Sequence, residues 1–139
     1  MPLEGNRDWL IRKKEYLMSD PDSRRRASEP EELARLFLER ANQGDVEGLV
    51  TLYEPGAVPA LPDGRIAVGA EEIRTFYATL LASRLQFQPG TQRPALRCGN
   101  LALTSSLLTN GTVTAEIARR QADGSWLWAV DQPAIASKE

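Results

Sequence analysis

The sequence lacks histidine altogether and contains a single cysteine, Cys98. Without histidine, the chain cannot supply a Ser-His-Asp triad, a Cys-His pair or a metal site with histidine ligands. Any proton transfer would therefore depend on carboxylates, tyrosines or lysines. One cysteine excludes an internal disulfide and is compatible with a reducing compartment, so we expect a cytoplasmic protein. The sequence predicts no cofactor and no metal site.

Long apolar runs and an excess of positive charge are also missing. No run approaches the ~20 residues of a membrane helix, and no signal-peptide pattern opens the chain. The formal net charge of −2 gives no basic field for nucleic acid or for an anionic membrane, so we expect neither as a partner. The 139 residues, 42% hydrophobic and 26% charged, have the composition of one globular domain with its own core.

Three amphipathic helices are predicted, over residues 28–41, 45–53 and 69–81. Ser28 and Glu31 have the spacing of a capping box at the start of the first helix. The third helix has an apolar face with the spacing i, i+3, i+4, i+7 and i+8, formed by Ile73, Phe76, Tyr77, Leu80 and Leu81.

After the third helix the pattern becomes that of strands. Residues 85–88 alternate between apolar and polar, which is typical of a strand. Asn110-Gly111 and Asp123-Gly124 each favour a two-residue type I′ hairpin turn. About four antiparallel strands therefore follow the helices, which predicts an α+β fold with a curved antiparallel sheet. Residues 57–68 suit a short hairpin or a loop over the mouth of a pocket.

The two turns predict which residues face each other across the strands. Glu116 would lie opposite Ser105 on one side and Asp131 on the other, and Ala118 would lie opposite Ala129. This face carries small, hydroxyl and acidic side chains, so we expect the helices to cover it and to enclose a pocket. Three of its residues are predicted ligand contacts, namely Ser105, Thr114 and Ala129.

The opposite sheet face would be too apolar for solvent exposure. We expect it to form a homodimer interface, with Arg119 opposite Trp128 and able to lie over its ring. The predicted interface residues are Ile117, Arg119, Trp126, Trp128 and Val130.

A carboxylate pair is the main candidate for chemistry. Glu116 and Asp131 would lie at cross-strand distance, where like charges repel unless one carboxyl keeps its proton. Tyr53 and Tyr77 could supply protons from the helices, although their apolar surroundings also fit a core role. Alternatively, this face is simply wet, or a nearby arginine neutralises the pair.

The chain divides into an N-terminal extension over residues 1–28, a body over residues 29–133 and a short tail over residues 134–139. The extension is strongly charged and carries one apolar cluster around Trp9 and Tyr16. It would form a peripheral helix, a lid or a partner-binding helix.

Three runs of the body resemble a known superfamily. They are FLERANQGDVEGLVTLY from Phe37 to Tyr53, VGAEEIRTFY from Val68 to Tyr77, and ARRQADGSWLWAVDQP from Ala118 to Pro133. These runs look like the nuclear-transport-factor-2-like fold, and within it like the ketosteroid isomerases and SnoaL-like polyketide cyclases. The resemblance implies a cone-shaped fold, in which three helices line a cavity over a strongly curved antiparallel sheet whose outer face often forms a dimer.

The resemblance carries over only part of the isomerase site. The position of the family's oxyanion-donating tyrosine falls on Phe37, and that of its general-base aspartate falls on Leu61, before Pro62. The position of its protonated oxyanion-hole acid falls on Glu116, a role in which a carboxylic acid stays neutral in an apolar pocket. Steroid isomerisation by the family mechanism is therefore not expected, and Phe37, Leu61 and Tyr77 are predicted to contact a ligand instead.

Three functions remain open from the sequence. The first is a dimeric pocket that binds a small, partly apolar metabolite without the isomerase catalytic set. The second is an acid–base enzyme, such as an isomerase, cyclase or dehydratase for a carbonyl substrate, with Glu116, Asp131 and Tyr53 as catalytic residues. The third is a non-catalytic interaction or scaffold domain. A buried, enclosed carboxylate pair would favour the second function, and a pocket filled by side chains would favour the third.

Overall fold

Three helices and a seven-stranded sheet form the part of the chain that the computed structural model describes, residues 24–137. The helices are α2 (Glu32–Asn42), α3 (Val46–Val50) and α4 (Gly69–Ala82). The strands are β1 (Tyr53–Pro59), β2 (Thr91–Gln92), β3 (Leu96–Cys98), β4 (Leu101–Thr104), β5 (Ser106–Leu107), β6 (Val113–Arg120) and β7 (Trp126–Ala136). Their main order is β1-β7-β6-β4-β3, and β5 pairs with both β2 and β6. The prediction of an α+β fold is confirmed.

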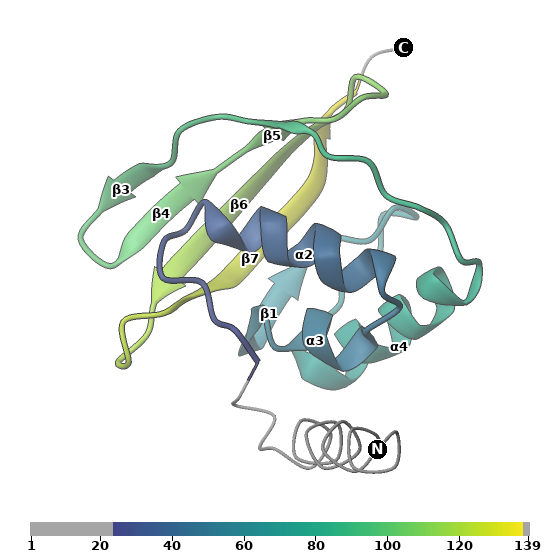
Figure 1. The fold of residues 1–139 in the computed structure, drawn as a ribbon, viewed down its shortest axis with the longest axis horizontal. Coiled ribbons are helices and arrows are strands. Elements are labelled where there is room, and N and C mark those ends of the chain that lie inside the picture. The colour runs from purple at the N-terminus through teal and green to yellow at the C-terminus, as the bar shows by residue number, and fades with distance from the viewer. Residues whose placement is uncertain (1–23, 138–139) are drawn as a thin grey trace, which may run out of the picture.

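The helices lie against one face of the sheet. In Figure 1, α2 crosses in front of β6 and β7, while α3 and α4 lie beside β1. The chain that leaves α4 then runs back along the molecule to β2 and β3 (Figure 1). Residues 85–88 lie in this connection and form no strand, so the alternating pattern was misleading there. No helix of the described residues is long and apolar enough to cross a membrane.

Strand β1 makes the sheet mixed, which corrects the prediction of a purely antiparallel one. It runs parallel to β7, with Tyr53 paired to Trp128 and Pro59 paired to Asp131. The second helix therefore ends at Val50 and does not reach Tyr53. Two prolines are tolerated in β1 because it is an edge strand, where only one side of the backbone needs a partner. Residues 57–68 do turn back on themselves, through a bridge between Ala60 and Ile66.

Both hairpin loops contain three residues instead of the predicted two. In the first, Leu108 N donates to Thr112 O, and Gly111 has a φ of 87°. In the second, Gln121 N donates to Ser125 O, and Gly124 has a φ of 86°. This is the other common hairpin geometry, in which a left-handed glycine follows a tight turn. The two dipeptides thus predicted the positions of the hairpins correctly. Because each loop is one residue longer than predicted, the strand pairing next to each loop is shifted by one residue from the predicted register.

The shifted registers have different consequences in the two hairpins. Glu116 lies opposite Thr104, and not opposite Ser105 as predicted. On its other side it lies opposite Asp131, as predicted. The second pairing survives because β7 has a bulge between its pairings to Ala118 and Ile117, and the extra residue restores the register.

The three-residue loop also decides which way the tryptophans face. Ala118 pairs with Trp128, and not with Ala129 as predicted, so Trp128 shares the covered face with Glu116. Trp126 and Trp128 are both buried in the core, so the prediction that they form a dimer interface is wrong. Their rings pack instead within the described chain, where Arg97 lies over the Trp126 ring at 5.8 Å from its centroid. Arg119 lies opposite Leu127, and not opposite Trp128 as predicted.

The outer sheet face still carries an apolar row. Across the paired strands, Val130 neighbours Val58 on β1 and Ile117 on β6, and Ile117 neighbours Leu103 on β4. The row ends at Leu96 on β3. Val130 is 48% exposed and Leu96 is 70% exposed in the single chain. Ile117 and Val130 are therefore on the predicted face, although their tryptophan neighbours are not.

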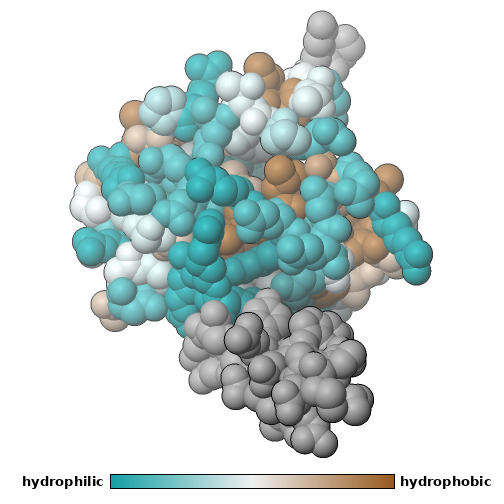
Figure 2. Space-filling model, viewed as in Figure 1, coloured by the Kyte–Doolittle hydropathy of each residue, from teal (hydrophilic) through white to brown (hydrophobic). Residues whose placement is uncertain are grey.

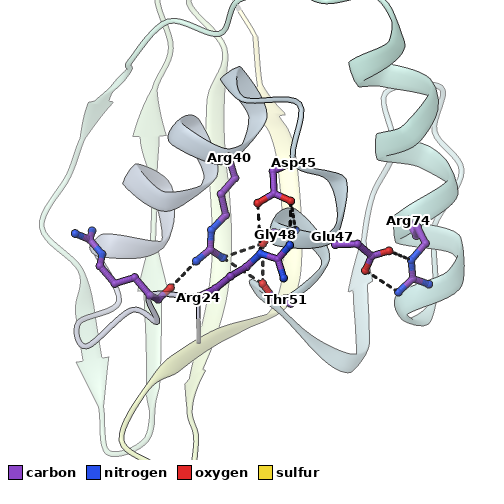
Figure 3. A network of polar contacts seen from close by, with 8 residues as sticks. Arg24, Arg40, Asp45, Glu47, Gly48, Thr51 and Arg74 are labelled. Carbon is purple, nitrogen blue, oxygen red and sulfur yellow. Dashed lines mark hydrogen bonds and ion pairs between the residues drawn. The ribbon is translucent and has the colours of Figure 1, made fainter. Parts of the chain in front are cut away.

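The buried side chain of Arg40 joins the N-terminal residues to the helical layer. Its guanidinium donates to Gly48 O at 2.8 Å, to Thr51 Oγ1 at 3.2 Å and to the backbone oxygen of Arg25 (Figure 3). Two residues further on, Ala27 is buried, and its carbonyl accepts a hydrogen bond from Trp126 N. Residues 24–27, which the sequence assigned to the extension, thus pack against the helices and β7.

We predict that replacing Arg40 by leucine lowers the free energy of unfolding by about 2–4 kcal/mol, because several buried acceptors lose their donor together. Denaturant titration with a fluorescence readout measures the change. Arg65→Leu is the matched control, since the side chain of Arg65 is 76% exposed and pairs only locally, with Asp63. It should shift stability by less than about 0.5 kcal/mol. Equal effects of the two substitutions would contradict the role given to Arg40.

Candidate functional site

A cavity of about 480 Å³ lies between the helices and the covered face of the sheet. Helices α2 and α4 and the segment after α4 supply mainly apolar walls, and β6 and β7 supply acidic and hydroxyl groups. Figure 2 shows hydrophobic side chains gathered on the right of the molecule, around the end of α4 and the segment that follows it. The aromatic residues of the lining are Phe37, Phe76, Tyr77, Phe87 and Trp128.

Several predicted site residues come together in this cavity. Phe37 from α2, Leu61 from the loop after β1 and Tyr77 from α4 all line it, as does Thr114 from β6. Glu116 and Asp131 line it as well. Elements that are distant in the sequence thus converge on one space of the size that small-molecule sites usually have.

Two predicted ligand contacts do not line the cavity. The hydroxyl of Ser105 donates to Thr114 O at 2.6 Å, so it is engaged within the sheet. Ala129 is buried beside the bulge and has no cross-strand partner in β6. Both misplacements follow from the two-residue turns that we assumed. A three-residue loop at Asn110-Gly111 would have put Thr104 opposite Glu116 from the sequence alone.

The carboxylates of Glu116 and Asp131 are buried side by side on the covered face. Burial, together with the negative charge of Glu116, raises the pKa of Asp131 to about 7, although a hydrogen bond from Tyr53 opposes the change. Burial also raises the pKa of Glu116, and the hydroxyls of Thr114 and Thr104 oppose that rise. Thr104 Oγ1 lies 2.7 Å from Glu116 Oε1. Both acids thus bind their protons more tightly than exposed carboxylates do, and Asp131 titrates near neutral pH.

Two tyrosines extend the hydrogen-bonded group from Asp131 toward the helices. Tyr53 Oη donates to Asp131 Oδ2 at 2.8 Å, and the hydroxyls of Tyr53 and Tyr77 lie 2.7 Å apart. Because a phenol has one proton, Tyr77 donates to Tyr53 while Tyr53 donates to Asp131. Burial and the charge of Asp131 raise the pKa of both phenols, which keeps them protonated. Tyr53 lies behind the cavity wall, whereas Tyr77 lines it.

The arrangement suits proton transfer better than metal binding or nucleophilic chemistry. An acid with a pKa near neutral pH lies beside a second buried acid whose pKa is also raised, and both line an apolar space. No group of three or more histidine, cysteine, aspartate or glutamate residues in the described part of the chain could hold a metal ion. The lining includes one basic side chain, Arg35.

Some cavity residues were missed by the sequence analysis. Trp128 was placed on the wrong face because a two-residue turn was assumed at Asp123-Gly124, where the loop has three residues. Phe87 was expected in a strand, and its place in the wall depends on how the segment after α4 folds back over α2. Neither position could be read from local periodicity.

Comparison with known proteins identifies the fold. No family model matches the sequence, and no curated protein matches it. Among solved structures, a ketosteroid isomerase-like protein from Erwinia carotovora atroseptica aligns with a TM-score of 0.60 and 20% identity, covering 76% of this chain and 93% of that one. An NTF-2 like protein of unknown function from Shewanella oneidensis aligns with a TM-score of 0.60 and 15% identity, covering 73% and 92%.

A third structure, a domain of unknown function with a cystatin-like fold from Nostoc punctiforme, aligns with a TM-score of 0.63 and 14% identity, covering 76% of this chain and 74% of that one. The chain therefore has the NTF2-like, cystatin-like fold, which confirms the fold that the sequence resemblance implied. At these identities the likeness concerns the fold alone.

We predict that Asp131→Asn stabilises the protein above neutral pH. The folded-state pKa of about 7 lies above the ordinary value of 3.8. Asp131 therefore costs no stability below about pH 4, and its cost grows as the pH rises to 7. The full shift corresponds to about 4 kcal/mol, so the asparagine variant should gain about 2–4 kcal/mol at pH 8 and little at pH 4.

Denaturant unfolding of wild type and variant from pH 4 to pH 9 measures this difference. Asp63→Asn is the matched control, since this exposed carboxylate has a pKa below its usual range because of hydrogen bonds from Arg65. The control should not gain stability as the pH rises. A loss of stability in Asp131→Asn at every pH would show that the carboxylate holds the fold together, against the electrostatics described here.

Proposed function

We propose that the protein is a cofactor-independent acid–base enzyme that acts on a small, largely apolar substrate in this cavity. The observation that carries the proposal is the enclosed pair of Glu116 and Asp131, whose burial raises the pKa of both acids and brings that of Asp131 to about 7. Among the functions left open by the sequence, a buried pair in an unfilled pocket supports the enzyme.

In the proposed reaction, the two acids work on one carbonyl substrate. In this scheme the ionised form of Glu116 acts as the base, and Asp131, which is partly protonated near its pKa of about 7, acts as the acid. Glu116 takes a proton from the carbon next to the carbonyl, and the electron pair of the broken C–H bond forms the new double bond of an enol. Asp131 gives its proton to the carbonyl oxygen, while Tyr53 stabilises the carboxylate that results. Return of a proton to the same carbon results in hydrogen exchange with solvent. Return of a proton to a conjugated carbon isomerises the substrate.

The lining of the cavity supports a substrate without negative charge. The two acidic groups would repel an anion, and apolar walls would exclude its hydration shell. The volume of about 480 Å³ suits a compact molecule with one ring system or a short chain. Its polar end would face the strands and its apolar part would face α2 and α4.

A second candidate, binding without catalysis, is supported by Phe37 and Leu61. These residues occupy the positions at which the resemblance to the isomerases would require a tyrosine and an aspartate. Both line the cavity as apolar groups. In that case the same cavity would hold a partly apolar metabolite, and the acidic pair would only orient its polar end.

We also propose that the protein is a homodimer through the outer face of its sheet. The support is the apolar row from Val58 through Val130 to Leu96, which solvent would otherwise cover. This interface keeps the predicted Ile117 and Val130 and replaces the two tryptophans by Leu103 and Leu96.

Hydrogen exchange tests the catalytic proposal without knowledge of the natural substrate. Uncharged ketones such as 2-tetralone and 4-phenyl-2-butanone are incubated with the protein in D2O, and loss of the α-proton signal is followed by NMR. We expect wild type to accelerate exchange, and Glu116→Gln and Asp131→Asn each to lower the rate about 10²- to 10⁴-fold. Glu71→Gln, on the exposed side of α4, is the control and should match wild type. Saturable ketone binding without faster exchange would favour the non-catalytic function.

The dimer is tested by placing a charge in the middle of the apolar row. We expect Val130→Glu and Leu103→Glu to sediment as monomers, because an unpaired carboxylate would be buried at the interface. Ile66→Glu is the control, since Ile66 is also exposed but lies in the loop after β1, outside the row. Wild type that sediments as a monomer, or a dimer that survives both substitutions, would contradict this interface.

A further inference from the structure

The segment between α4 and β2 forms one wall of the cavity. Residues 87–90 all belong to the lining, although none of them lies in a helix or strand. In Figure 1 this connection leaves the end of α4 and passes α2 on its way to the sheet. We call residues 84–90 the strap.

The strap is fixed differently at its ends and in its middle. At the start, Arg84 has a φ of 56°, a left-handed conformation that redirects the chain as α4 ends. At the other end, Gly90 lies so close to β5 that a Cβ atom there would be 2.9 Å from Leu107 O. Between these two points, no hydrogen bond of the described residues joins the strap to a helix except those of Asn42.

Asn42, the last residue of α2, binds the strap with both ends of its side-chain amide. Its Nδ2 donates to Phe87 O at 3.0 Å, and its Oδ1 accepts from Phe87 N at 2.7 Å. The side chain thus takes the place of a neighbouring strand for one residue. Both bonds are exposed to solvent, so each contributes modestly to stability and can open without unfolding the core.

The residue held in this way completes an aromatic wall. The Phe87 ring packs edge-on against Phe37, with the centroids 6.3 Å apart. Phe37 in turn contacts the rings of Tyr77 at 5.8 Å and Trp128 at 6.1 Å. The ring of Phe87 therefore forms the part of the cavity wall beside Phe37.

We infer that Asn42 is a positioning residue that controls entry to and exit from the cavity by holding Phe87 in place. The inference rests on the proposed function only in treating the cavity as the ligand site, and it does not depend on catalysis. Loss of both hydrogen bonds would let the strap open more often while the closed state keeps its contacts. Ligand would then enter and leave faster, with little change in affinity, because the bound geometry is the same.

The experiment uses N-phenyl-1-naphthylamine, an uncharged probe that fluoresces in apolar surroundings, with stopped-flow detection on the full chain. We expect Asn42→Ala to raise both the association and the dissociation rate about 5- to 100-fold, the range that two lost hydrogen bonds allow. The dissociation constant should stay within about threefold of wild type. Asn42→Asp keeps the acceptor for Phe87 N and loses the donor to Phe87 O, so its rates should lie between those of wild type and those of Asn42→Ala.

Asn110→Ala is the matched control. This asparagine also accepts a backbone hydrogen bond through Oδ1, from Thr112 N, but it lies in the hairpin loop between β5 and β6. Its rates should equal those of wild type. If Asn42 acts through the Phe87 ring, Asn42→Ala should have less than about a twofold effect in a Phe87→Ala background, where that part of the wall is already gone.

Each outcome bears on the inference. Parallel rises in both rates that vanish in the Phe87→Ala background support it. Unchanged rates in Asn42→Ala, an equal effect of Asn110→Ala, or a weaker affinity with an unchanged association rate would overturn it. Absence of saturable probe binding to wild type would overturn both this inference and the cavity as a ligand site. Gated binding without ketone exchange would overturn the catalytic proposal alone.

Discussion

Burial of two neighbouring carboxyl groups is the constraint on which the rest of this structure depends. Glu116 and Asp131 lie opposite each other on a face of the sheet that the helices cover. Such a pair is stable only if one proton is kept and if hydroxyl groups surround the oxygens, and Thr104 and Tyr53 supply those hydroxyls. The same burial raises the pKa of Asp131 into the neutral range, where a carboxyl group can both give and take a proton.

The bulge in β7 lets this acidic pair share a face with aromatic core residues. Without the extra residue, the register set by the hairpin loop would turn Asp131 away from Glu116 or turn Trp128 away from the core. With it, Trp128 packs against Tyr53 at 5.4 Å, and the phenol of Tyr53 reaches Asp131. Bulges commonly redirect side chains beside functional sites, and this one joins the core to the candidate site.

The fold supplies the cavity walls from parts of the chain that have no local reason to meet. Arg40 fastens the N-terminal residues and α3 to α2, which fixes the helical layer over the sheet (Figure 3). Two residues further along, at the last residue of α2, Asn42 fastens the strap. The last turn of α2 thus carries both Arg40 and Asn42, and Phe37, earlier in the same helix, lies in the cavity wall.

The sequence by itself determined the α+β class, the three helices and the two hairpins, because periodicity and turn residues are local. The facing of Glu116 and Asp131 was also predicted, but it holds only because the bulge in β7 offsets the longer hairpin loop. It also indicated the fold through the runs from Phe37 to Tyr77. Only the tertiary structure decided the loop lengths, the bulge, the parallel edge strand and the burial of both tryptophans. An Asn-Gly or Asp-Gly pair suits two hairpin geometries almost equally, and packing against the helices selects between them. A one-residue slip reverses every side chain of a strand, so the sheet faces depended on contacts that the sequence does not display.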